Sequence, residues 1–233
     1  MKISEIIEKN KNSIILIALY IPEAEKANQG KVSIRGTGFI ISRDGKFITT
    51  GHVYKQIPQN ELPYLEASAP GLVDEKGITH YDRYKVKLLK MDDKNDLALM
   101  QIISDKNNFE TIAGLGNSEL VKEGDEVVFI GYPLATELLG MQFGITMSTN
   151  HCIISSVKRR GIDGSLHFFM IDTHINNGSS GSPVFLKDTG KVIGIASGRI
   201  SSKIPAPDGK IFDIPANMGI CRPAKYAINL ISR

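Results

Sequence analysis

Three side chains in separate segments have the chemical types that nucleophilic catalysis needs: His52, Asp96 and Ser180. A serine hydroxyl is a weak nucleophile until a neighbouring base takes its proton, and an imidazole can serve as that base. A carboxylate that accepts a hydrogen bond from the imidazole fixes the tautomer of the ring and stabilises its charged form. We therefore predict a catalytic triad of these three residues, suited to acyl transfer.

The surroundings of His52 and Asp96 favour these roles over structural ones. His52 follows an apolar segment, and the end of a strand can present a side chain into a cleft while the backbone stays fixed. A single histidine is more often a packing or surface residue, so this position alone does not decide. Asp96 directly precedes the apolar residues 97–99, which draw its carboxylate toward the interior. A buried carboxylate needs a partner, and the imidazole of His52 would provide one.

Ser180 lies in a short loop, residues 176–183, that is rich in glycine and serine. Such a composition is also common in flexible linkers. However, acyl transfer needs backbone N–H groups aimed at the developing oxyanion, as well as a hydroxyl on a tight turn. The neighbouring Gly178 and Gly181 permit such a turn. We predict that the N–H groups of Gly178 and Ser180 form an oxyanion hole.

Short strand-like segments bounded by Gly, Asn, Asp and Pro must position these residues. Many short strands with turns at roughly ten-residue spacing predict an all-β sandwich or barrel, and 233 residues fit two barrels better than one. Convincing long helices are expected only at the two ends, over residues 3–11 and over residues 224–231 after Pro223. The expected strands cover residues 13–20, 31–35, 38–42, 47–50, 84–89, 96–102, 127–130, 144–147, 152–157, 167–172, 184–186 and 192–195.

We expect two lobes, one over residues 1–115 and one over residues 116–233. The connection between them is predicted over residues 104–124, the least strand-like interior stretch. Residues 55–82 contain three prolines and little periodicity, so we expect a long surface loop of the first lobe there.

Composition excludes several classes of function. A net charge of +3 without a dense basic stripe argues against a nucleic-acid partner. No run approaches the roughly 20 apolar residues of a membrane span. The apolar stretch at residues 14–21 is short and has charged flanks, so a signal peptide is not expected and a cytoplasmic location is favoured, with the compartment left open.

The sequence also argues against metals and cofactors. No nucleotide fingerprint, P-loop or zinc motif is present, and we expect neither a metal nor a cofactor. Cys152 and Cys221 lack the spacing of metal ligands and do not form a disulfide framework. We expect both to be small buried apolar residues, with their pairing left open.

Together the segments around these candidates resemble the chymotrypsin-like serine peptidases, most closely the protease domain of the Deg/HtrA family. The segments are residues 36–41, 48–53, 95–99, 115–118, 121–133, 175–183 and 192–195. The resemblance implies two packed antiparallel six-stranded β-barrels with the site in the cleft between them. It also implies a serine endopeptidase that hydrolyses internal bonds of a protein or peptide substrate through an acyl-enzyme.

The resemblance places the primary specificity pocket near His174, Ile175 and the strand of Ala196, Ser197 and Gly198. His174 has two interpretations of similar weight. It is either a histidine satisfied at a strand end, or a pocket residue that favours an acidic or polar side chain of the substrate.

The loop departs from the family pattern at two positions. Ser182 replaces a glycine, which resembles the staphylococcal glutamyl endopeptidase group, and Ser180 aligns with the family nucleophile. Ser179 stands where digestive enzymes of this type carry the aspartate that captures a newly cut N-terminus, so we expect activity without such a cut. Because the chain ends at Arg233, we expect no C-terminal peptide-binding (PDZ) module.

A different class of function stays open as the alternative. The same fold could act as a regulated or inactive peptide-binding or sensing module, because a loop containing Gly178 can hold the oxyanion hole collapsed until a partner binds. The sequence does not identify an activating partner or an oligomer.

Overall fold

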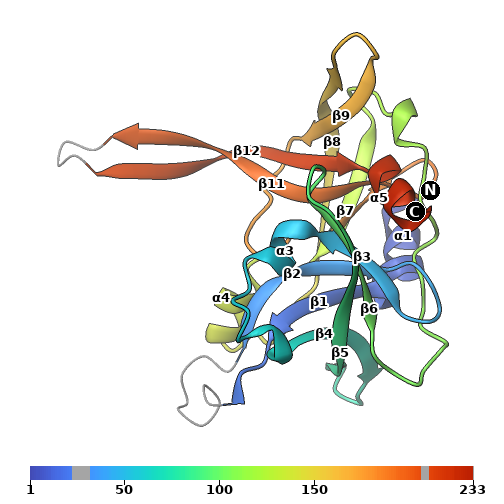
Figure 1. Ribbon diagram of the computed structural model, residues 1–233, viewed down its shortest axis with the longest axis vertical. Helices are drawn as coiled ribbons and strands as arrows, with labels where there is room; N and C mark the ends of the chain where they lie inside the picture. The colour runs from blue at the N-terminus through green and yellow to red at the C-terminus, as the bar shows by residue number, and fades with distance from the viewer. Residues whose placement is uncertain (23–31, 206–209, 233) are drawn as a thin grey trace.

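Two closed antiparallel β-barrels of six strands each make up the chain (Figure 1). The computed structural model describes residues 1–22, 32–205 and 210–232. Lys31, which begins one of the expected strands, and the last residue, Arg233, lie outside the described residues. The predicted all-β fold of two barrels is confirmed.

The first barrel is closed by the pairing of β1 with β4. Every residue of β1 is apolar, and both faces of this strand are buried. Ile15 and Ile17 point into the barrel interior, whereas Ile14 and Leu16 pack in a core between the barrels. The strands are β1 (Ile14–Leu19), β2 (Ser33–Ile40), β3 (Lys46–Thr50), β4 (Leu65–Val73), β5 (Thr79–Asp92) and β6 (Leu97–Ile102).

The second barrel is closed by the pairing of β7 with β10. From β7, Val128 and Ile130 join the core between the barrels, which fixes the two barrels against each other. The strands are β7 (Glu126–Gly131), β8 (Ser148–Arg160), β9 (Ser165–Ile171), β10 (Pro183–Leu186), β11 (Val192–Pro205) and β12 (Ile211–Pro223). The outer parts of β11 and β12 leave the barrel as a two-stranded arm (Figure 1).

The two terminal helices confirm the prediction, and both pack on the core between the barrels. Ile6 of α1 and the pair Ala227 and Leu230 of α5 belong to that core. The helices are α1 (Ile3–Asn10), α3 (Gly51–Lys55), α4 (Ala135–Gly140) and α5 (Ala224–Ser232), with short 3-10 turns at η1 (Lys11–Ser13), η2 (Leu62–Tyr64) and η3 (Ser118–Leu120).

Two expectations were wrong. Residues 55–82 are not a surface loop, because β4 and the start of β5 lie there. The sequence did not indicate β4 because its inward-facing residues, Ala67 and Ala69, are small, although they pack in the core of the first barrel. Pro70 also suggested a loop, but it lies at an irregularity in the pairing of β4 with β5, where a missing N–H is tolerated. Residues 144–147 are not a strand either: Gly144 has a φ of +73°, and β8 begins only at Ser148.

The connection between the barrels follows the prediction. Between β6 and β7 the described chain contains η3 and one isolated parallel bridge, from Leu115 to Val192, but no strand. The division of the chain at residue 115 stays a prediction.

Candidate active site

His52 is the second residue of α3, directly after the end of β3 in the first barrel. The preceding Gly51 donates its N–H to the carbonyl of Asp96 at 2.9 Å. A Cβ atom at Gly51 would lie 3.0 Å from Met91 Sδ and 3.2 Å from Asp96 Oδ1, so glycine lets the two segments approach closely. This junction places the His52 ring beside the carboxylate of Asp96.

Both carboxylate oxygens of Asp96 accept hydrogen bonds. Oδ1 accepts the backbone N–H of His52 at 2.8 Å, and Oδ2 lies 2.7 Å from His52 Nδ1. Oδ2 also accepts the hydroxyl of Ser197 at 3.0 Å, across the gap between the barrels. Asp96 directly precedes β6 with a φ of +55°, a left-handed conformation that aspartate tolerates better than most residues.

The surroundings of Asp96 keep its carboxyl group ionised. Burial by itself raises the pKa, but the hydrogen bonds and charge of His52 and the bond from Ser197 outweigh it and hold the pKa of Asp96 below its ordinary value. An ionised carboxylate can only accept hydrogen bonds, so Nδ1 of His52 must carry the proton. With Nδ1 directed at Asp96, Nε2 is the ring nitrogen left to act as a base.

The loop that carries Ser180 is packed so closely that two of its positions require glycine. Gly178 and Gly181 have φ values of +89° and +91°. A Cβ atom at Gly178 would lie 2.2 Å from the carbonyl oxygen of Tyr132, and one at Gly181 would lie 2.0 Å from that of Thr37. The loop is therefore wedged between the end of β7 and strand β2.

Thr37, a fully buried residue of β2, donates hydrogen bonds to two carbonyls of this loop. Its hydroxyl donates to the carbonyl of Gly178 at 2.7 Å, and its N–H donates to the carbonyl of Ser180 at 2.8 Å. The same hydroxyl oxygen accepts the N–H of Tyr132 at 3.1 Å. One first-barrel residue thus holds the nucleophile loop of the second barrel.

Backbone hydrogen bonds also hold the carbonyls of Asn176 and Asn177, which precede Gly178. Ser179 donates its N–H to the carbonyl of Asn176 at 3.0 Å, which with the positive φ of Gly178 corresponds to a type II turn. The N–H of Leu134 donates to the carbonyl of Asn177 at 2.7 Å. In a trans peptide the N–H points opposite to the carbonyl, so the N–H of Gly178 faces away from Leu134.

In the described structure, two N–H groups between Gly178 and Ser182 are left available. Those of Ser179, Gly181 and Ser182 all donate hydrogen bonds within the chain. Those of Gly178 and Ser180 have no acceptor among the described residues. These are the two donors predicted for the oxyanion hole, and this pattern is what an oxyanion hole requires.

His52, Gly178 and Ser180 line one cavity of about 480 Å³ between the barrels. Arg35 and the helix α4 form parts of its wall. No hydrogen bond joins Ser180 to His52 in the part of the chain that the structure describes. Catalytic hydrogen bonds often tighten only once substrate is bound.

The two neighbouring serines of the loop lie elsewhere. Ser179 and Ser182 are fully buried, and neither hydroxyl has a hydrogen-bond partner among the described residues. Ser182 packs against Gly131, where a Cβ atom would lie 1.9 Å from its Oγ. Of the three serines, Ser180 is the one that lines the cavity.

None of the residues expected at the specificity pocket lines the cavity beside Ser180. Ile175 is buried in the core of the second barrel, and its side chain lies against Gly219, where a Cβ atom would be 2.7 Å from Ile175 Cδ1. Ala196 is fully buried and Gly198 is partly exposed. His174 is exposed and does not line the cavity beside Ser180, and its role in specificity stays a prediction.

Sequence reasoning did not assign roles to Thr37 and Leu134, and considered Ser197 only for specificity. Thr37 lies between Gly36 and Gly38, and this Gly-Thr-Gly segment was the available signal for close packing. No local signal marks Leu134, whose contribution comes from its backbone.

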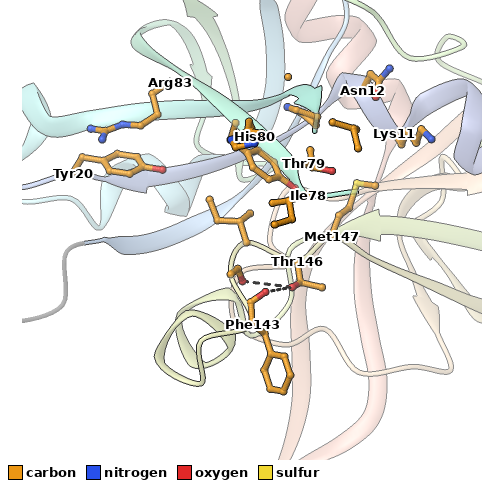
Figure 2. A pocket seen from close by; sticks show the side chains of 16 residues that line it. Lys11, Asn12, Tyr20, Ile78, Thr79, His80, Arg83, Phe143, Thr146 and Met147 are labelled. Atoms are coloured by element: carbon orange, nitrogen blue, oxygen red, sulfur yellow. Dashed lines mark hydrogen bonds between the residues drawn. The ribbon is translucent and has the colours of Figure 1, made fainter. Parts of the chain in front are cut away.

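A second and larger cavity, of about 790 Å³, contains none of these residues. It lies between the β4–β5 hairpin and residues 143–147, and Figure 2 shows His80 and Phe143 at opposite walls. Its charged side chains have partners within the chain, such as Arg83, which pairs with Glu66 and covers the ring of Tyr20. The chemistry of the smaller cavity, rather than its size, marks it as the candidate active site.

Within the described ranges, no cluster of three or more histidine, cysteine or acidic side chains could hold a metal ion. None of the described helices has the length and apolar character needed to cross a membrane. Cys152 and Cys221 are both buried and unpaired.

Comparisons with known proteins identify similar sequences. The family model of a trypsin-like peptidase domain matches residues 36–195. The magnetosome formation protease MamE of Paramagnetospirillum magneticum is 33% identical over 78% of this chain and 22% of its own length. Two probable periplasmic serine endoproteases, both named DegP-like, are also similar. The protein from Chlamydia trachomatis is 31% identical over 74% of this chain and 30% of its own length. The protein from Marinomonas sp. is 32% identical over 82% of this chain and 35% of its own length. The matched region therefore covers about a third or less of each of these relatives.

Proposed function

Because this chain belongs to the trypsin-like peptidase family, we propose that it is a serine endopeptidase that hydrolyses internal peptide bonds of proteins. One observation supports this most directly. The cavity lined by Ser180 and His52 also receives Gly178, whose N–H, like that of Ser180, has no acceptor among the described residues. This arrangement supports the proposal, because acyl transfer needs a nucleophile, a base and oxyanion donors at one place.

The proposed reaction has two stages. Ser180 Oγ attacks the substrate carbonyl carbon while Nε2 of His52 takes the hydroxyl proton. The N–H groups of Gly178 and Ser180 stabilise the negative oxygen that develops. His52 then gives the proton to the leaving amine, and an acyl-enzyme remains. Water, deprotonated by His52, attacks the ester carbon. The bond to Ser180 Oγ then breaks, the second product leaves as a carboxylic acid, and His52 returns its proton to Ser180 Oγ. Asp96 orients the ring and stabilises its positive charge throughout.

A fluorophosphonate probe tests this proposal, because it forms a covalent bond only with an activated serine. We expect labelling of the intact chain and loss of labelling in Ser180→Ala. Ser182→Ala is the matched control, since that hydroxyl is buried against Gly131. Continued labelling of Ser180→Ala would contradict the proposal.

A regulated or inactive peptide-binding module is the second candidate. It is favoured by the absence, among the described residues, of a hydrogen bond between Ser180 and His52. A module of this kind would bind a peptide reversibly and release it without cleaving it. Mass spectrometry of the peptide after incubation separates the two candidates, because only the enzyme produces fragments.

A further inference from the structure

Arg35 lies in the wall of the candidate active site, and no step of the proposed reaction uses it. It lines the same cavity as His52 and Ser180. The next residue, Gly36, packs so closely on the nucleophile loop that a Cβ atom there would lie 2.7 Å from the carbonyl oxygen of Ser180. The backbone of β2 therefore fixes the start of the Arg35 side chain beside the nucleophile.

A β-bulge in β2 occurs at Arg35. Ile34 lies opposite Ala18 of β1. Gly36 lies opposite Ile17, the preceding residue of β1, so Arg35 is the extra residue and has no partner in that strand. Bulges next to active sites change the direction of a side chain. The bulge thus falls on the residue that brings the only permanent positive charge among the described residues of this cavity wall.

The guanidinium group of Arg35 is only partly satisfied within the chain. Its side chain is 26% exposed, and its one hydrogen bond within the described ranges is long, with 3.4 Å from Nη2 to Oε2 of Glu61. Nε is buried and has no hydrogen-bond partner there. By contrast, Nε of Arg83 lies 2.7 Å from Oε2 of Glu66, a normal length for such a pair. Since a guanidinium carries several N–H donors in a planar fork, Arg35 retains donors for a carboxylate.

The cavity lies where the leaving part of a substrate would lie. In the proposed reaction, the attacking water takes the place beside Nε2 of His52 that the leaving amine has vacated. The open space next to His52 therefore holds the residues after the scissile bond before it admits this water. Helix α3 carries His52, and Gln56, at the C-terminal end of this helix, lies one turn later along the same wall.

We infer that Arg35 binds an acidic side chain of the polypeptide substrate, in one of the first residues after the scissile bond, and so determines specificity there. A carboxylate fits because it can accept two parallel N–H bonds from a guanidinium. Glu137 of α4 lines the same cavity, but it is exposed and water can solvate its charge, whereas the partly buried charge of Arg35 needs an anion. The inference rests on the proposed function and names a substrate class for it.

Quenched peptides that differ at a single position test this inference. Glu, Gln or Lys would be placed in turn at each of the three residues on either side of the scissile bond, and kcat/KM would be measured. At one position after the bond, we expect the wild type to favour Glu over Gln by about tenfold. Arg35→Gln should abolish this ratio, and Arg35→Glu should reverse the preference toward Lys. Arg35→Lys keeps the charge without the fork and should retain part of the ratio.

Arg43→Gln is the matched control, because Arg43 is an exposed arginine of the same barrel that does not line the cavity. It should keep the wild-type ratio. Fluorophosphonate labelling shows that each variant is folded, since the probe needs an activated Ser180 and no peptide contact on the leaving side.

A Glu-to-Gln ratio that is equal in the wild type and Arg35→Gln would overturn the inference, and so would a preference that occurs only before the scissile bond. A failure of the proposed function shows separately, as absent fluorophosphonate labelling of the wild type. In that case, fluorescence anisotropy of the uncleaved peptides still decides. If the wild type binds the Glu and Gln peptides with equal Kd, Arg35 does not bind the acid.

Discussion

The hydroxyl of Thr37 in the first barrel donates a 2.7 Å hydrogen bond to the carbonyl of Gly178 in the second. This bond crosses between the barrels and orients the peptide group that follows the proposed oxyanion donor. The N–H of Thr37 holds the carbonyl of Ser180 in the same way. The packing of the two barrels is therefore coupled to the shape of the candidate site.

Thr37→Val keeps the side-chain shape and removes the hydroxyl. The carbonyl of Gly178 and the N–H of Tyr132 would each lose a buried partner, at a cost of about 1–3 kcal/mol per group. We expect kcat to fall by about tenfold or more, with a smaller change in KM, because the loss falls on oxyanion stabilisation. Steady-state kinetics would measure this. The control variant Thr37→Ser keeps the hydroxyl and should retain most of the wild-type kcat. Equal kcat values for Thr37→Val and the wild type would contradict the prediction.

Asp96→Asn should change both activity and the pH dependence of stability. The folded state lowers the pKa of Asp96, so its ionised form stabilises the fold above the unfolded pKa of about 4. This contribution is lost as the pH falls through the lower, folded pKa. The difference in unfolding free energy between wild type and variant should therefore be largest near neutral pH and shrink in acid.

Urea unfolding at several pH values would measure that difference. We also expect kcat of Asp96→Asn to fall by about 10⁴-fold, because the tautomer of His52 is no longer fixed. Asp93→Asn is the control, since Asp93 forms an exposed pair with Lys55. A stability difference between wild type and Asp96→Asn that stays constant from pH 7 to pH 3 would count against this account.

Ile175→Ala should widen the choice of residue before the scissile bond. Ile175 lies against Gly219 in the region where the specificity pocket is predicted, and its removal leaves space there. We expect the wild type to prefer small apolar residues and the variant to accept leucine or phenylalanine. The variant should also lose about 2–5 kcal/mol of stability.

A peptide library with varied residues before the scissile bond would compare wild type, Ile175→Ala and His174→Ala. Exposed His174 serves as the neighbouring comparison. If His174→Ala changes the preference and Ile175→Ala does not, the pocket is read by His174, and the prediction for Ile175 is wrong.

The two cysteines should be inert in the folded chain. Burial, and to a smaller extent the charge of Asp172, raises the pKa of Cys152 to about 12, and burial raises the pKa of Cys221 as well. Because the thiolate is the reactive form, iodoacetamide at pH 8 should modify neither residue until the chain is unfolded. Intact mass with and without urea gives the measurement, and modification of either thiol in the folded chain would contradict it.

The sequence predicted most strands because their apolar residues and turn signals are local. It missed β4, where Ala67 and Ala69 are small and Pro70 suggested a loop. It also missed all of β12 and the outer part of β11, because most residues there are exposed and carry no regular burial pattern. Local patterns predict only segments whose own residues show regular burial. The missed strands lack such a pattern, and their conformation depends on pairing with neighbouring strands.

By itself the sequence determined the two-barrel fold class and the candidates His52, Asp96 and Ser180, because residue type, order and flanking glycines are written locally. Only the tertiary structure decided that Thr37 holds Gly178, 141 residues away, and that Ser197 bonds Asp96, 101 residues away. It also decided that the N–H groups of Gly178 and Ser180 have no acceptor among the described residues, whereas those of Ser179, Gly181 and Ser182 do. The physical reason is that a hydrogen-bond partner across two barrels is chosen by how their cores pack, which no local spacing of residues encodes.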